Sequence, residues 1–142
     1  MVPRPETELL VETARVIGLD VVEARLELAR QLGADAVVDA SRHNLVEAVR
    51  ELTGNEMVDF CVEAVGKPDA LTTAAFLPRR QGRLYVFGVP HHDRQEFPWF
   101  HTVCNETEII TSMGPECKEY FQNAVDMILH GEVDLATMVQ PR

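Results

Sequence analysis

Short β-branched apolar segments alternate with amphipathic segments along this chain, and no other feature limits its fold as much. The apolar segments end at Gly or Asp, whereas the amphipathic segments place apolar residues three and four positions apart. This alternation is typical of βαβ units, in which helices connect strands that pair in parallel. We therefore expect an α/β fold, with a parallel sheet that carries helices on both faces.

The positions of the elements follow from periodicity and from glycines. Strands are predicted over 16–19, 36–38, 57–62, 84–87 and 108–111, and helices within 1–14 and over 22–32, 45–52, 68–77 and 115–130. The run at 57–62 is almost continuously apolar, which indicates a central strand covered on both faces. Residues 78–82 are expected to form a turn, and 91–105 an irregular loop with a helical turn near Phe100.

Length, charge and cysteines narrow the class of protein. The 142 residues suffice for a single domain, 1–142, with a buried core. A formal net charge of -10 disfavours binding to nucleic acid or to an anionic membrane surface. No apolar run approaches the ~20 residues of a membrane-spanning helix. Cys61, Cys104 and Cys117 are far apart and form no Cys-x-x-Cys motif, so we expect reduced thiols and a cytoplasmic protein.

Asp20 is the first candidate for ligand binding. In open parallel sheets ligands bind beyond the carboxyl ends of the strands, where Asp20, Asp39, 63–66 and 88–90 are expected. An acid in that place can accept hydrogen bonds from both adenosine ribose hydroxyls, and it repels a 2'-phosphate, which would favour NAD over NADP. Arg25 could close over the same ribose. Equally, Asp20 could serve only to start the following helix.

The register around Asp20 has a second interpretation. The first helix could continue to Ile17, with Gly18 as its end and 19–22 as the strand. In that register Asp20 would lose the ribose role.

The eight glycines are too widely spaced for a phosphate-binding loop. They occupy positions 18, 33, 54, 66, 82, 88, 114 and 131, so neither G-x-G-x-x-G nor a P-loop motif is present. A dinucleotide could therefore be held only by its ends. Gly66 and Gly88, at expected strand ends, allow either the close approach of a ligand or a tight turn.

The histidines do not form a metal-binding pattern. His91 and His92 are adjacent, and His101 and Cys104 share the irregular loop, where a metal would need two further ligands from elsewhere. We expect no metal site in this chain.

Glu63 is expected to be a strand-end carboxylate that nearby backbone amides hold.

An ordered series of segments extends over about residues 15–140. The segments are VIGLD at 16–20, EARLELA at 23–29, LGAD at 32–35, VDFCVEAVG at 58–66, GRLYVFGVP at 82–90, EIITS at 108–112 and GEVDL at 131–135. This series resembles the cofactor domain of medium-chain, zinc-type alcohol dehydrogenases. The resemblance implies a Rossmann-like fold that is incomplete, because the first strand and the glycine-rich loop of such a domain are missing.

The resemblance also implies a cofactor and its contacts. The matching positions are Asp20 and Arg25 at the adenosine ribose, Ala64, Val65 and Gly66 beside the adenosine end, and Phe87, Gly88 and Val89 beside the nicotinamide. The implied reaction is NAD-dependent oxidation of an alcohol or polyol by hydride transfer, with zinc polarising the substrate oxygen. The family's zinc ligands belong to a separate catalytic domain. The chain is thus expected to be a cofactor-domain fragment without catalytic activity alone.

Residues 2–12 are similar to a different family. They resemble the segment before the cofactor strand in release-factor glutamine methyltransferases of the PrmC/HemK type. That family requires a glycine-rich loop and an Asn-Pro-Pro-Tyr motif, and the chain has neither. Its activity is therefore not expected here, and residues 1–14 are predicted to be an atypical N-terminal helix.

A structural or interaction module without a ligand is an alternative from another class of function. Such a module could form a homodimer by adding an edge strand to its partner's sheet. The missing first strand would lie between the strands at 16–19 and 57–62. It would leave a gap that must close or be filled by another chain.

Overall fold

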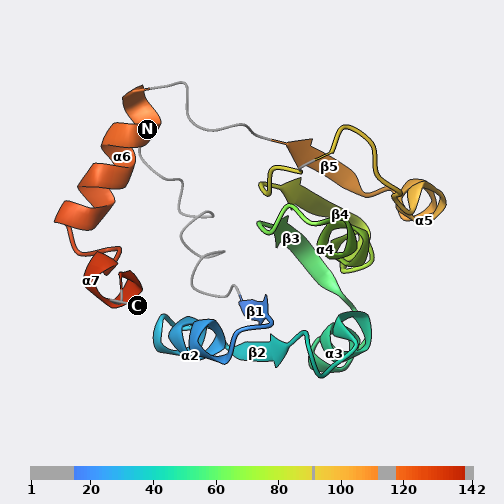
Figure 1. Cartoon of the computed structure of the whole chain (residues 1–142), viewed down its shortest axis with the longest axis horizontal. Coiled ribbons are helices and arrows are strands. Elements are labelled where there is room, and N and C mark those ends of the chain that lie inside the picture. The colour runs from blue at the N-terminus through green and yellow to red at the C-terminus, as the bar shows by residue number, and fades with distance from the viewer. Residues whose placement is uncertain (1–14, 91, 112–117, 140–142) are drawn as a thin grey trace. The chain divides into compact units, whose positions relative to one another are not determined.

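The computed structural model describes residues 15–90, 92–111 and 118–139 (Figure 1). The predicted helix within 1–14 lies outside these residues. The chain divides into two compact units, Met1–Leu45 and Val46–Arg142, which are described separately. All the strand pairs among the described residues are parallel, and helices alternate with these strands along the chain, as the sequence predicts.

The first unit is a two-stranded βαβ unit. Strand β1 (Ile17–Asp20) pairs with β2 (Ala36–Asp39), and helix α2 (Glu23–Gln31) connects them. Leu26 of α2 is only 2% exposed and anchors the helix. A Cβ on Gly18 would lie 3.2 Å from the Cβ of Ala29, so the glycine lets the helix approach the strand closely. The strand that ends at Asp20 is confirmed, and the alternative register, with a strand at 19–22, is wrong.

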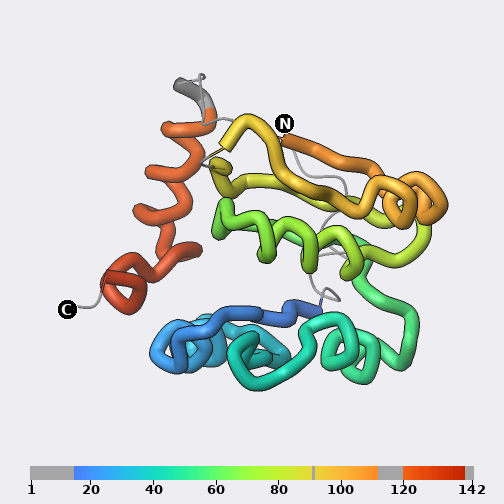
Figure 2. The backbone as a smooth tube through the Cα atoms, turned by 45° about the vertical axis from the view of Figure 1, so that its right-hand side comes forward, coloured from blue at the N-terminus to red at the C-terminus, as the bar shows by residue number. Residues whose placement is uncertain are grey.

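The second unit holds a three-stranded sheet in the order β3-β4-β5. Its elements are α3 (Leu45–Leu52), β3 (Val58–Glu63), α4 (Pro68–Ala74), β4 (Pro78–Val86), α5 (Trp99–Cys104) and β5 (Glu108–Thr111). Helix α4 lies along β3 and β4 (Figure 2). Ala75, Leu77 and Leu84 are buried and form the core of this unit. Helix α5 confirms the helical turn predicted near Phe100.

Strand β4 is longer than expected. The sequence predicts a turn at 78–82, but the strand already begins at Pro78. The pairing shifts between Val58↔Pro78 and Phe60↔Arg83, so extra residues of β4 bulge out, and Gln81 has a φ of 59°. The chain therefore does bend at the predicted position. It forms a bulge inside a strand because β3 pairs on both sides of it.

Strand β3 departs from its predicted burial. Cys61 and Glu63 are buried, whereas Phe60 and Val62 are 48% and 55% exposed. The expectation that both faces of this strand are covered is wrong for the described part of the chain. Alternate side chains of a strand point to opposite faces, and β3 buries only the face that carries Cys61 and Glu63.

Two further helices follow β5. Helix α6 spans Lys118–Leu129 and α7 spans Leu135–Met138. Gly131 follows α6 with a φ of 74°, and Asp134 caps α7 by accepting a hydrogen bond from the backbone N–H of Thr137. Within the described ranges, no helix combines the length and the apolar character that crossing a membrane requires.

Candidate functional site

Asp20 ends β1 and contacts the beginning of α2. Its Oδ1 accepts a hydrogen bond from the backbone N–H of Val22 at 2.9 Å, which accounts for a role in starting the helix. Its Oδ2 lies 3.4 Å from the guanidinium of Arg25, and the two side chains are 27% and 68% exposed. The second oxygen can therefore accept hydrogen bonds from an outside hydroxyl while the first holds the helix. Both interpretations of Asp20 are compatible with this geometry.

Asp39 lies beside Asp20, because the two residues are partners in the β1–β2 register. Its Oδ1 accepts hydrogen bonds from the hydroxyl and the backbone N–H of Ser41, and Arg42 lies 3.1 Å from Oδ2. The hydrogen bonds from Ser41, and then the charge of Arg42, lower the pKa of Asp39 below its ordinary value. Asp39 is thus an ionised neighbour of Asp20 whose own oxygens are already engaged.

Glu63 ends β3 and holds the turn that follows it. Its Oε1 accepts hydrogen bonds from the backbone N–H groups of Val65 and Gly66 at 2.7 and 2.8 Å. This confirms the expectation that backbone amides hold the carboxylate. The backbone oxygen of Glu63 also accepts hydrogen bonds from Phe87 and Gly88, each at 2.8 Å. One residue therefore contacts both of the predicted strand-end turns, 64–66 and 87–89.

Gly66 and Gly88 are each packed against the other's turn. A Cβ on Gly88 would lie 2.2 Å from the backbone nitrogen of Gly66, and a Cβ on Gly66 would lie 2.5 Å from the carbonyl oxygen of Val89. Protein backbone thus fills the space beside each glycine. This close packing explains both glycines without a ligand and was not anticipated from the sequence. Gly66 also has a φ of 74°, as a turn requires.

The remaining residues of the two turns are exposed. They are Ala64, Val65, Phe87 and Val89. Apolar side chains at strand ends that no described element covers can contact the rings of a nucleotide. These four side chains are therefore accessible to a ligand at the strand ends.

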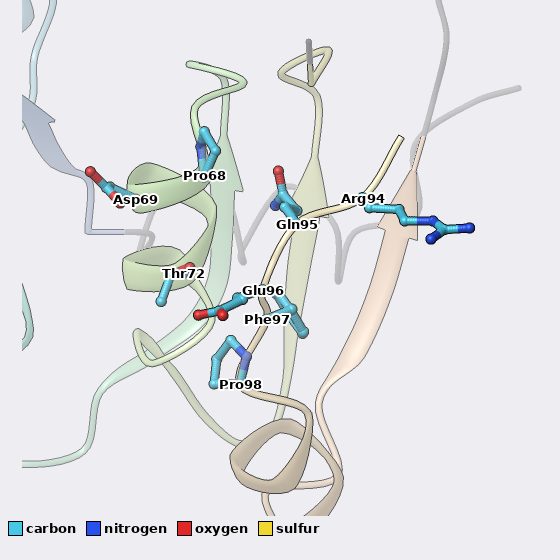
Figure 3. Close-up of a pocket in the computed structure, with 8 residues that line it drawn as sticks. All are labelled: Pro68, Asp69, Thr72, Arg94, Gln95, Glu96, Phe97 and Pro98. Atoms are coloured by element: carbon cyan, nitrogen blue, oxygen red, sulfur yellow. The ribbon is translucent and has the colours of Figure 1, made fainter. Parts of the chain in front are cut away.

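The second unit contains a pocket that the sequence does not predict (Figure 3). It encloses about 550 Å³ between one side of α4, with Pro68, Asp69 and Thr72, and the loop at 94–98. Figure 3 shows Glu96 extending toward Thr72. The Nε2 atom of Gln95 is buried without a hydrogen-bond partner among the described residues. The loop has no periodic pattern, so no sequence signal could have placed it against α4.

The residues considered for metal binding are not brought together. The ring of His101 packs on Phe76, with centroids 4.5 Å apart, and Cys104 is exposed. His91 lies outside the described residues. In the part of the chain that the structure describes, no group of three or more His, Cys, Asp and Glu side chains could hold a metal ion.

Comparison with known proteins identifies a related family. The model for "zinc-binding dehydrogenase" matches residues 11–130. An L-threonine 3-dehydrogenase of Streptomyces coelicolor is 34% identical over 131 residues, which is 89% of this chain and 36% of that protein. The chain thus spans little more than a third of the length of this curated relative.

Solved structures share the fold. An alcohol dehydrogenase from the archaeon Aeropyrum pernix is 34% identical, with a TM-score of 0.76 over 89% of this chain and 36% of its own. A Sinorhizobium meliloti protein of the zinc-binding dehydrogenase type, bound to NADP, has a TM-score of 0.76 at 24% identity, over 85% of this chain and 36% of its own. At that identity the second likeness indicates the fold alone.

Proposed function

Because this chain belongs to the zinc-binding dehydrogenase family, we propose that it is the cofactor-binding part of a dehydrogenase and binds NAD. In this proposal Asp20 and Arg25 hold the adenosine ribose. The turn at 64–66 contacts the adenosine end, and the turn at 87–89 contacts the nicotinamide. The chain does not by itself oxidise an alcohol or polyol.

The observation that carries the proposal is the arrangement of Asp20. It is a partly exposed carboxylate at the carboxyl end of a parallel strand, where dinucleotide folds bind the ribose. One oxygen is engaged by the helix start, and the other is shared with the exposed Arg25. The neighbouring Asp39 adds a second negative charge at the same strand ends. Both carboxylates would repel a 2'-phosphate, so the chain should bind NAD in preference to NADP.

The zinc of the family does not fit the described residues. They offer no cluster of side chains that could coordinate a metal ion. We therefore assign no step of the reaction to a metal in this chain. When NAD is bound it supplies the hydride acceptor, while the residues of this chain bind and orient it.

Isothermal titration with NAD and NADP tests the proposal. Wild-type protein should bind NAD more tightly than NADP. Asp20→Asn keeps an oxygen for Val22 but removes the charge, and it should reduce this preference by about tenfold. Asp35→Asn is the matched control, because Asp35 is a carboxylate of the same unit that accepts a hydrogen bond from Val16 at the other end of β1. No binding of NAD at millimolar concentration would overturn the proposal.

An interaction module without a ligand is the second candidate. It is favoured by the exposed Phe60 and Val62 on β3 and by the position of β3 and β5 as the outer strands of their sheet. Such a module would form a homodimer through a sheet edge. Light scattering at high protein concentration distinguishes the two, because a strict monomer that binds NAD contradicts this second candidate.

A further inference from the structure

Glu63 contacts both of the turns that are proposed to border the cofactor. We propose that Glu63 is a positioning residue for NAD: it fixes the turn at 64–66 against the turn at 87–89 and so sets the affinity for the dinucleotide without touching it. This inference rests on the proposed function. It adds a residue that the sequence assigned only to local structure.

Four backbone hydrogen bonds converge on Glu63. Its carboxylate accepts hydrogen bonds from the backbone N–H groups of Val65 and Gly66. Its backbone oxygen accepts hydrogen bonds from the backbone N–H groups of Phe87 and Gly88. All four nitrogen–oxygen distances are 2.7–2.8 Å. The two turns lie at the carboxyl ends of the neighbouring strands β3 and β4. A displacement of either turn would therefore break bonds to the same residue, which couples the two turns to each other.

The packing between the turns leaves no room for adjustment. A Cβ on Gly88 would lie 2.6 Å from Oε2 of Glu63, so the carboxylate sits directly over this glycine. Such a close arrangement of backbones is preorganised, because the free protein already holds both turns in one conformation. Preorganised binding segments lose less conformational entropy when the ligand arrives.

Stability alone does not account for a carboxylate in this place. Glu63 is 4% exposed, and its Oε2 has no hydrogen-bond partner among the described residues. Burying a polar group with one oxygen unpartnered costs free energy that an apolar side chain of similar size would not cost. Because the side chain is buried, a ligand that contacts the exposed Val65 and Phe87 does not reach it. These features point to a positioning role rather than to direct contact.

The test compares two replacements of similar size in the full chain. Glu63→Gln retains an oxygen that can accept the N–H groups of Val65 and Gly66, whereas Glu63→Met has none. Amide hydrogen exchange followed by NMR should find both N–H groups protected in wild type and in Glu63→Gln, but exposed to exchange in Glu63→Met. Titration should give an NAD affinity about tenfold lower in Glu63→Met and within about threefold of wild type in Glu63→Gln.

Asp59→Ala is the matched control, because Asp59 is an exposed carboxylate at the other end of β3 and pairs with Arg79. Its NAD affinity should equal that of wild type. If Glu63→Met folds, as judged by circular dichroism, and binds NAD as tightly as wild type, the role of Glu63 is structural and the proposal is overturned. The proposal is also overturned if wild-type protein binds NAD while the amides of Val65 and Gly66 are not protected from exchange.

If Glu63→Met does not fold, amide exchange of wild-type protein with and without AMP tests whether the two turns are coupled. AMP carries only the adenosine end of the cofactor, and through Glu63 it should raise the protection of Phe87 and Gly88 as well as of Val65 and Gly66. Protection confined to the turn at 64–66 overturns the coupling. If wild type binds neither AMP nor NAD, the proposed function fails and this inference fails with it, even where the amides are protected.

Discussion

Gly88 has no positive φ, yet the structure leaves no space for a side chain there. Gly88→Ala would place a methyl group 2.2 Å from the backbone nitrogen of Gly66, so one of the two turns must move. We expect a loss of about 1–3 kcal/mol in the free energy of unfolding, as for overpacked sites. Urea denaturation measures it.

Gly54→Ala provides the comparison for Gly88→Ala. Gly54 has a φ of 63°, and no heavy atom lies within 4 Å of the place that a Cβ would take, so its replacement strains the backbone only. That strain is about 1–2 kcal/mol for a left-handed residue. A distinguishing readout is the exchange of the Val65 and Gly66 amides, which Gly88→Ala should accelerate and Gly54→Ala should not. If Gly88→Ala leaves the exchange of these amides unchanged, the turns can separate without losing the hydrogen bonds of Val65 and Gly66, and the prediction is wrong.

Cys61 should be an unreactive thiol. Burial, and then the negative charge of Glu63, raise the pKa of Cys61 from its ordinary value of 9.0 to about 11. At pH 8 the thiolate fraction is then lower by about 100-fold, and disulfide exchange slows accordingly. The reaction of each thiol with dithiodipyridine is measured in a separate protein, and both proteins carry Cys117→Ser. Adding Cys104→Ser leaves Cys61 as the reacting thiol. Adding Cys61→Ala instead leaves Cys104. Equal rates in the two folded proteins would contradict this prediction.

Glu106 joins the bulge of β4 to the turn before β5. It accepts hydrogen bonds from Gln81 and Arg80, each at 2.7 Å. The bond from Gln81, and then the bond and charge of Arg80, lower the pKa of Glu106 below its ordinary value of 4.5. Its contribution to stability is therefore complete above pH 4.5 and is lost as the pH falls through the lowered pKa.

Glu106→Gln should be less stable than wild type at pH 7, and the difference should shrink as the pH is lowered from 4.5 to 3. Urea unfolding at a series of pH values measures this. In an Arg80→Ala background the same replacement should show a smaller pH-dependent difference, because one partner of Glu106 is gone. A difference that is constant with pH would contradict the assignment.

The elements differ in how far local sequence determines them. Helix α2 and its end at Gly33 follow from a three- and four-residue periodicity and a glycine with a φ of 99°, both of which are local properties. The bulge in β4 and the exposure of Phe60 depend on which strands and helices are neighbours in space, and periodicity does not encode that. The ribose candidate Asp20 could be located because a strand end is a local feature. The contact between Gly66 and Gly88 could not, because 21 residues separate the two positions in the sequence.

Each of the two units has a core of its own. Leu26 and Val38 are buried in the first unit, and Leu77 and Leu84 in the second. A large-to-small change in one core should therefore act mainly within its own unit. Leu26→Ala and Leu84→Ala should each lower the free energy of unfolding of the affected unit by about 2–5 kcal/mol.

Hydrogen exchange with mass spectrometry locates these effects, because local openings raise exchange only in the segment that opens. Leu26→Ala should accelerate exchange in residues 15–45 more than in residues 58–111, and Leu84→Ala should do the reverse. Leu32→Ala, at an exposed position directly after α2, is a control that should change stability by no more than about 0.5 kcal/mol. If both core variants accelerate exchange equally throughout, the chain unfolds as one cooperative body. Ribose binding at Asp20 would then depend energetically on the core around Leu84, and Leu84→Ala would weaken NAD binding as much as Leu26→Ala does.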